Sequence, residues 1–190
     1  MTKIEKAQEF AHEAHDRIKQ VRKYSGEPYW VHTDAVAAIV AAVTGSTEDM
    51  VVAAHLHDLL EDVTPKNPDY SEARIAELFG KPVLLMVKEL TDVFTKEAYP
   101  QWNRAKRHTM ENERLGTIST QSKTIKLADL IHNTSSIVAN DAGFAKVYLK
   151  EKLALLGMLS DGDPGLLERA SMQTVAGFAM LGIPLPVFHA

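Results

Sequence analysis

Apolar residues recur at intervals of three and four along most of this chain, and this period decides the class of fold. Near the N-terminus, Thr2 and Glu5 have the spacing of a helix capping box. The apolar positions that follow share one helical face, and they are Ile4, Ala7, Phe10, Ala11, Ala14, Ile18 and Val21. No stretch alternates apolar and polar residues for long enough to indicate a sheet. The sequence therefore predicts an all-α fold.

Turn and breaker residues divide the rest of the chain into further helices. Gly26 and Pro28 interrupt the first helix, Gly45 ends the second, and Ser46 and Asp49 are candidate caps of the third. The later helices are expected to end or begin at glycine and proline. The pattern predicts helices over residues 34–43, from 46–49 through the segment AAHLHDLLEDV, and over 71–80, 82–90, 102–115, 121–139, 145–159 and 165–181.

Length and composition indicate one domain. With 190 residues, the chain suits a single helical domain over residues 1–182, and the two prolines of IPLPVFHA predict an extended tail over 183–190. No apolar run approaches the roughly 20 residues that cross a bilayer, and the first residues lack a signal-peptide core, so we expect a cytoplasmic protein. The net charge of −4 and dispersed basic residues argue against a nucleic-acid partner.

The stretch AAHLHDLLEDV places histidines and carboxylates in an otherwise apolar helix. Buried carboxylates need a counter-charge, hydrogen bonds or a metal ion. Successive helical residues are about 100° apart, so His57 and Asp58 can flank one point, whereas His55 faces elsewhere. Glu61 and Asp62 follow one turn later and are expected to continue along the same groove.

Two further segments offer metal-binding side chains. Asp129 and Asn133 are four residues apart in KTIKLADLIHN, and His32 comes just before the predicted second helix. The chain has no cysteine, so imidazole and carboxylate are its strong metal donors. His32, His57, Asp58 and Asp129 form a set suited to one Mn²⁺, Fe²⁺, Zn²⁺ or Mg²⁺, with positions left open for water and hence for catalysis.

These motifs, in this order over residues 4–140, resemble those of the HD-domain metal-dependent phosphohydrolases. Within that group RKYSGEPYWVH, HDLLEDV, VKELTD and KLADLIHN are similar to the (p)ppGpp hydrolase domain of RelA/SpoT-type proteins and of small Mesh-type hydrolases. The resemblance implies a compact helical bundle with a metal site between helices. It further implies Mn²⁺ on the four ligands, a catalytic pair at Glu61 and Asp62, phosphate contacts from Arg22 and Lys23, and Asn133 near the nucleotide.

The implied reaction removes the 3′-diphosphate of (p)ppGpp as pyrophosphate and leaves GDP or GTP. Three departures from the family pattern, Thr33, Val63 and Ser135, bear on the substrate more than on the metal. Two alternatives therefore stay open: a phosphohydrolase of another nucleotide such as NADPH, and a nucleotide-binding regulator without turnover. The expected partner is a small-molecule nucleotide, and the oligomeric state is left open.

Several polar residues carry no fixed interpretation. The group Arg104, Lys106 and Arg107 is either a solvated helix face or part of a flap that reaches the phosphates. His132 is either a support of the metal site or a packing residue, and Tyr29 and Trp30 shape the pocket or anchor their loop. The isolated histidines are expected at the surface, and they are His12, His15, His108 and His189.

Overall fold

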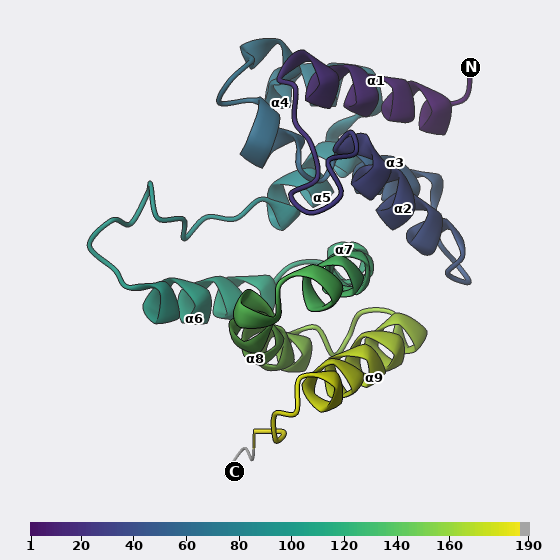
Figure 1. The fold of residues 1–190 in the computed structure, drawn as a ribbon. Coiled ribbons are helices and arrows are strands. Elements are labelled where there is room, and N and C mark those ends of the chain that lie inside the picture. The colour runs from purple at the N-terminus through teal and green to yellow at the C-terminus, as the bar shows by residue number, and fades with distance from the viewer. Residues whose placement is uncertain (187–190) are drawn as a thin grey trace.

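The computed structural model describes residues 1–186 and confirms the all-α class. The predicted tail is coil over residues 183–186, and its remainder, with His189, lies outside the described residues. Within residues 1–186 there are nine α-helices, a π-helical turn, a 3-10 turn and no β-strand (Figure 1). Their bounds are α1 Lys3–Arg17, α2 Trp30–Ala41, α3 Glu48–Leu56, η1 Leu59–Val63, η2 Pro68–Tyr70, α4 Glu72–Phe79, α5 Lys81–Leu90, α6 Arg104–Leu115, α7 Thr120–Asn140, α8 Ala142–Met158 and α9 Pro164–Met180.

Local side chains cap the first turn of most of the α-helices. The capping box of Thr2 and Glu5 is present as predicted. The cap of α3 is Thr47, whose hydroxyl accepts from the Met50 amide at 3.3 Å, and not Ser46 or Asp49. Gly80 separates α4 from α5 at φ 89°, a conformation that only glycine adopts readily.

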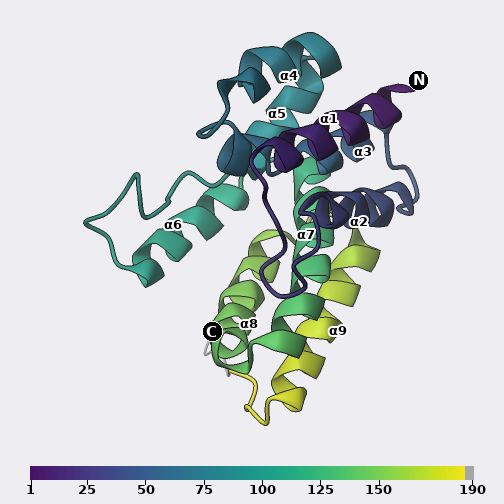
Figure 2. The ribbon, with the colours of Figure 1, turned by 45° about the horizontal axis from the view of Figure 1, so that its top comes forward.

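Helix α7 lies at the centre of the molecule and joins its two halves. Figure 1 shows α1, α2, α3 and α5 on one side of α7, and α8 and α9 on the other. In Figure 2, α8 and α9 lie beside the lower part of α7. Small residues allow α1 and α3 to approach closely, since Ala7, Ala11, Ala53 and Ala54 are fully buried. The described helices include none with both the length and the hydropathy needed to cross a bilayer.

The first helix ends earlier than the apolar pattern predicts. It stops at Arg17, and Lys19 adopts a left-handed conformation at φ 53°. The following loop, residues 18–29, turns back on itself through the bond from the Arg22 amide to the Glu27 carbonyl at 2.8 Å, so Val21 is exposed. Helix α2 then begins at Trp30, and His32 lies inside its first turn and not before it.

The segment AAHLHDLLEDV is not one regular α-helix. Helix α3 ends at Leu56, and residues Leu59–Val63 form a π-helical turn, closed by the Thr64 amide bonding the Leu59 carbonyl at 2.9 Å. The Thr64 hydroxyl adds bonds to the carbonyls of Leu59 and Tyr70 at 3.1 and 2.6 Å. Single π turns widen a helix and are frequent at functional sites.

A buried polar contact links α7, α8 and α9. The Lys152 ammonium donates to the Thr134 hydroxyl at 2.7 Å and to the Gln173 carbonyl at 3.2 Å. Gln173 in turn donates to the Ile131 carbonyl at 3.0 Å. Burial lowers the pKa of Lys152 to about 7, because no carboxylate forms an ion pair with it among residues 1–186.

Gly162 lies in the turn between α8 and α9, where its surroundings leave little space for a side chain. We therefore expect Gly162→Ala to destabilise the fold. A Cβ there would lie 2.9 Å from Leu127 Cδ1, 3.2 Å from the Leu159 carbonyl and 3.3 Å from the backbone of Lys123. We expect the free energy of unfolding, measured by urea denaturation, to fall by about 1–3 kcal/mol, as in other overpacked sites.

Gly157→Ala in α8 is the matched control, because a Cβ there meets no atom within 4 Å. Alanine is favoured over glycine in a helix by about 1 kcal/mol, so this variant should be slightly stabilised. Equal stability losses in the two variants would contradict the packing described for Gly162.

Candidate metal centre and active site

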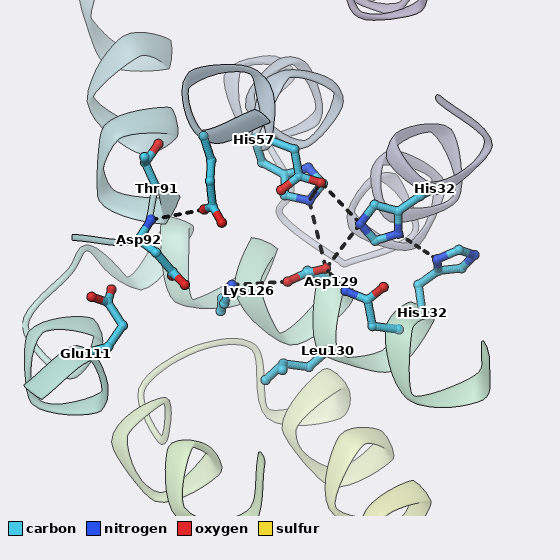
Figure 3. A network of polar contacts seen from close by, with 12 residues as sticks. His32, His57, Thr91, Asp92, Glu111, Lys126, Asp129, Leu130 and His132 are labelled. Atoms are coloured by element: carbon cyan, nitrogen blue, oxygen red, sulfur yellow. Dashed lines mark hydrogen bonds and ion pairs between the residues drawn. The ribbon is translucent and has the colours of Figure 1, made fainter. Parts of the chain in front are cut away.

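Two histidines and a carboxylate from three separate helical segments meet at one point. His32 lies on α2, His57 at the end of α3 and Asp129 on α7, and one ligand atom of each lies within 4.8 Å of the other two. The distances from Asp129 Oδ1 to Nε2 of His32 and of His57 are 3.2 and 3.9 Å (Figure 3). Asp58 Oδ2 lies 3.5 and 3.1 Å from the same two nitrogens.

The two imidazoles offer unused nitrogen atoms to this point. Nε2 of His32 and Nε2 of His57 are buried and have no hydrogen-bond partner in residues 1–186. His57 Nδ1 lies 2.8 Å from the Ala54 carbonyl, so Nδ1 carries the proton when the ring is neutral, and Nε2 presents its lone pair to the carboxylates. This is the arrangement of a metal-binding histidine, whose other nitrogen is held by an oxygen acceptor. The donor set thus fits a divalent cation.

His132 supports His32, which resolves the alternatives left open for it. Nδ1 of His132 lies 2.7 Å from Nδ1 of His32 (Figure 3). Burial, with His32 nearby, lowers the pKa of His132 to about 4, so its neutral ring can accept the His32 proton. His32 Nε2 is then free to act as a ligand.

The charges at this point are strongly interdependent. Burial disfavours the protonated form of His57, but the carboxylate of Asp58 outweighs it and raises the pKa of His57 to about 9. At neutral pH a metal ion would therefore displace the proton on Nε2 when it binds. Burial likewise opposes ionisation of Asp129, yet Lys126 at 3.2 Å from Oδ2, together with His32, holds the pKa of Asp129 well below its usual value. The carboxylates are therefore ionised and attract positive charge.

Tyr29, whose role was left open, and Lys126, which the sequence interpretation missed, hold the carboxylates of the site. Tyr29 donates its hydroxyl proton to Asp58 Oδ2 at 2.8 Å, which makes the tyrosine a support of the cluster. Lys126 pairs with Asp129 from one turn earlier on α7. The i, i+3 spacing of the two residues in KLAD was the available signal for that pair. Trp30, by contrast, bonds Asp16 at 3.2 Å and stacks on His12.

Glu61 and Asp62 both line one cavity, but they hydrogen-bond to different neighbours. Glu61 Oε2 accepts from the backbone amide of Asp92 at 3.2 Å, and Asp62 Oδ2 accepts from the Gln20 side chain at 2.8 Å. The two residues are adjacent within the π turn, so their side chains leave the backbone in different directions. Solvent reaches Glu61, but loss of hydration within its pocket and the nearby Asp92 and Asp58 raise its pKa to about 8.

The loop after α5 is held against the site by α6. Glu111 Oε2 accepts from the amides of Val93 and Phe94 at 3.1 and 3.0 Å. Arg114 donates to the carbonyls of Glu89 and Thr91 at 3.0 and 3.1 Å. These contacts fix the backbone that presents the Asp92 amide to Glu61.

A cavity of about 770 Å³ adjoins the carboxylates. Its wall combines Glu61 and Asp62 with the post-α5 loop and α6. Arg104 and Arg107 line it, whereas Lys106 lies over the Trp102 ring at 4.2 Å from the centroid. Arg104 also pairs with Glu151 at 2.7 Å. The basic group is thus divided between cavity wall and surface.

The predicted substrate-binding residues occupy two places. Asn133 donates to Asp129 Oδ1 at 2.6 Å and accepts from Arg22 at 3.0 Å, so Arg22 and Asn133 adjoin the metal ligands. Lys23 instead contacts Asp141 at 3.3 Å, at the start of α8, and its side chain is 71% exposed. Of the predicted basic pair, Arg22 therefore lies at the site and Lys23 lies away from it.

The surface positions predicted for the isolated histidines are only partly confirmed. His15 is fully buried and not at the surface, because it faces the core side of α1 beside Tyr29. His12 is half-buried and contacts Asp34 at 3.0 Å. His55 lies apart from the metal ligands as predicted, 3.2 Å from Asp34 Oδ1. His108 is 39% exposed and lies 3.4 Å from Glu151.

The chain is similar to known proteins both in sequence and in fold. Residues 7–155 match the family model of the HD domain. A probable guanosine-3′,5′-bis(diphosphate) 3′-pyrophosphohydrolase of Synechocystis sp. is 32% identical over 130 residues, which cover 66% of this chain and 16% of that protein. Guanosine-3′,5′-bis(diphosphate) 3′-pyrophosphohydrolase MESH1 of Drosophila melanogaster is 31% identical over 114 residues, covering 60% of this chain and 58% of the relative. The chain thus spans less than two thirds of the length of these relatives.

One solved structure is similar over nearly the whole chain. It is described as a metazoan ortholog of SpoT that hydrolyzes ppGpp and plays a role in starvation responses. It superposes with a TM-score of 0.77 at 24% identity, covering 97% of this chain and 98% of that one. Identity at this level shows a shared fold.

The donor set predicts stabilisation by a divalent metal. A ligand that binds only the folded state raises the free energy of unfolding by about 2.7 kcal/mol at 100 times its dissociation constant. We expect Mn²⁺ to raise the unfolding midpoint of the wild-type protein in a chelator-treated sample. His57→Ala should lose that increase, because the variant lacks one of the two partnerless nitrogens.

His55→Ala is the matched control, since it removes a buried histidine from the same helix but outside the cluster. Whatever its own stability, it should keep the Mn²⁺-dependent increase. An increase that survives His57→Ala and disappears with His55→Ala would place the metal elsewhere.

Proposed function

The chain belongs to the HD-domain family, and from this premise we propose that it hydrolyses guanosine 3′,5′-bis(diphosphate) and its triphosphate counterpart with the help of one divalent cation. Water replaces the 3′ oxygen on the proximal phosphorus, so the products are pyrophosphate and GDP or GTP. The relatives named as 3′-pyrophosphohydrolases support this choice of substrate.

The observation that carries the proposal is the pair of buried imidazole nitrogens without partners beside two carboxylates. His32, His57, Asp58 and Asp129 would hold the cation. We propose Mn²⁺, which the two carboxylates and water at the open positions suit, with the two imidazoles completing the set. When bound, such an ion lowers the pKa of water and polarises a phosphoryl oxygen. Fe²⁺, Zn²⁺ and Mg²⁺ are the alternatives to test.

The cavity lined by Glu61 and Asp62 supports a nucleotide ligand. Its volume of about 770 Å³ falls within the range of small-molecule sites. Arg104 and Arg107 in its wall, with Arg22 beside the metal ligands, supply guanidinium groups that bind phosphate through paired hydrogen bonds. The whole protein carries a net charge of −4, which disfavours binding of a polyphosphate. These arginines supply positive charge locally, where the phosphates would bind.

Glu61 and Asp62 are proposed to handle the protons. One carboxylate accepts a proton from the attacking water, and the other returns one to the departing 3′ oxygen, which balances the reaction. The raised pKa of Glu61, about 8, suits the donor at neutral pH, and Asp62 then acts as the acceptor. Asn133 and Arg22 orient the phosphate next to Asp129.

The proposal is tested by product analysis with metal-replete protein. Incubation with ppGpp, pppGpp and NADPH should release pyrophosphate from the two guanosine nucleotides. Glu61→Gln should keep the metal, measured by elemental analysis, and lose about 10²–10⁴-fold in turnover, the usual contribution of a general acid or base.

Glu168→Gln, an exposed carboxylate on α9, is the control and should turn over as the wild type does. Inorganic phosphate from NADPH without pyrophosphate from ppGpp would replace the proposed substrate. Nucleotide binding without turnover of any of the three would favour a regulator.

A further inference from the structure

The turn after α1 places Gln20 between a buried histidine and one of the two catalytic candidates. Gln20 Nε2 donates to Asp62 Oδ2 at 2.8 Å, and Gln20 Oε1 lies 2.8 Å from His15 Nδ1. The three side chains come from α1, the loop that follows it, and the π turn. They therefore form a chain of hydrogen bonds that ends on Asp62.

The hydrogen-bonding capacity of each group determines which atoms donate and which accept along this series of hydrogen bonds. An ionised carboxylate only accepts, so the Gln20 amide nitrogen faces Asp62 and its carbonyl oxygen faces His15. His15 Nδ1 must then carry a proton and donate it to Gln20. The backbone of Gln20 is itself held, since its amide bonds the His15 carbonyl at 3.0 Å and its carbonyl accepts from the Tyr29 amide at 3.1 Å.

His15 is a polar side chain that is buried in the core. It is fully buried on the core side of α1, where an aliphatic residue would satisfy packing. Its Nε2 has no hydrogen-bond partner in the described part of the chain, so the bond to Gln20 is its polar contact there. Burial lowers the pKa of His15, which keeps the ring neutral and the donor role unambiguous.

Tyr29 links the hydrogen bonds of His15, Gln20 and Asp62 to the proposed metal ligands. Its ring packs against His15 at 4.8 Å between centroids, and its hydroxyl donates to Asp58 at 2.8 Å. Asp62 is thereby oriented from the α1 side by side chains, whereas Glu61 is held from the α5 side by a backbone amide. The two carboxylates are positioned independently.

We propose that His15 and Gln20 are positioning residues that orient the carboxylate of Asp62 for proton transfer. This inference rests on the proposed function, in which Asp62 reacts with water. Neither residue touches the reacting atoms, so both act through Asp62. Loss of a hydrogen bond to a charged group typically corresponds to about 10- to 100-fold in a rate.

The first test separates orientation from general stability. Gln20→Met keeps the length of the side chain but cannot donate, and it should lower kcat about 10- to 100-fold while changing KM little. His15→Leu should act in the same direction, and His15→Asn, whose amide can replace the Nδ1 donor, should recover part of kcat. Gln121→Met, an exposed glutamine on α7, is the control and should leave kcat unchanged.

A double-mutant cycle decides whether the effect passes through Asp62. In an Asp62→Asn background, Gln20→Met should reduce kcat by less than about threefold further, since residues acting as a unit are not additive. A full 10- to 100-fold loss in that background, or an unchanged kcat in the single variant, would overturn the inference.

A spectroscopic readout distinguishes failure of this inference from failure of the proposed function. Nitrogen-15 NMR of metal-free protein at neutral pH should show His15 as a neutral ring protonated at Nδ1, with its signal displaced in Gln20→Met. A ring protonated at Nε2, or at both nitrogens, would overturn the hydrogen-bond chain. If the wild type hydrolyses no nucleotide while this signature holds, the proposed function fails and the arrangement of the three side chains stands.

Discussion

Two buried imidazole nitrogens facing a carboxylate are the constraint on which this structure depends. Nε2 of His32 and Nε2 of His57 lie around Asp129 Oδ1 with no hydrogen-bond partner in residues 1–186, and desolvated polar atoms of this kind destabilise a fold unless a ligand satisfies them. The three residues come from α2, α3 and α7, so the packing of these helices against one another determines the geometry of the site. Lys126 and Tyr29 hold the carboxylates from behind.

The π turn after the His57–Asp58 pair converts this metal-binding arrangement into one suited to catalysis. It directs Glu61 toward the Asp92 amide and Asp62 toward Gln20, so the two carboxylates have separate neighbours. Groups with different environments can hold different protonation states, which is what a reaction needing both an acid and a base requires. The early end of α1 is part of the same arrangement, because it frees Gln20 to reach Asp62.

Sequence patterns were sufficient for the class of fold and for bringing His32, His57, Asp58 and Asp129 into one candidate cluster, but they missed the contact of Lys126 with Asp129. Helical periodicity gave the helices, and the spacing of His57 and Asp58 placed them at one point while excluding His55. Three features could not be read in this way. The π turn is closed by the Thr64 amide and accompanied by a bond from the Thr64 hydroxyl to the Tyr70 carbonyl. The burial of His15 depends on how α1 packs, and the direction of Lys23 toward Asp141 depends on a tertiary contact. Local periodicity carries no information on such contacts.

The most direct test of the central claim is a crystal structure of the protein with Mn²⁺, recorded at the manganese absorption edge. Such data locate the ion through its anomalous scattering, independently of any activity. The account predicts one peak bonded to Nε2 of His32, Nε2 of His57 and the carboxylates of Asp58 and Asp129, at about 2.0–2.3 Å, in the range of metal–ligand bonds. A peak at another group of side chains, with both imidazole nitrogens still lacking a partner at high Mn²⁺ concentration, would contradict it.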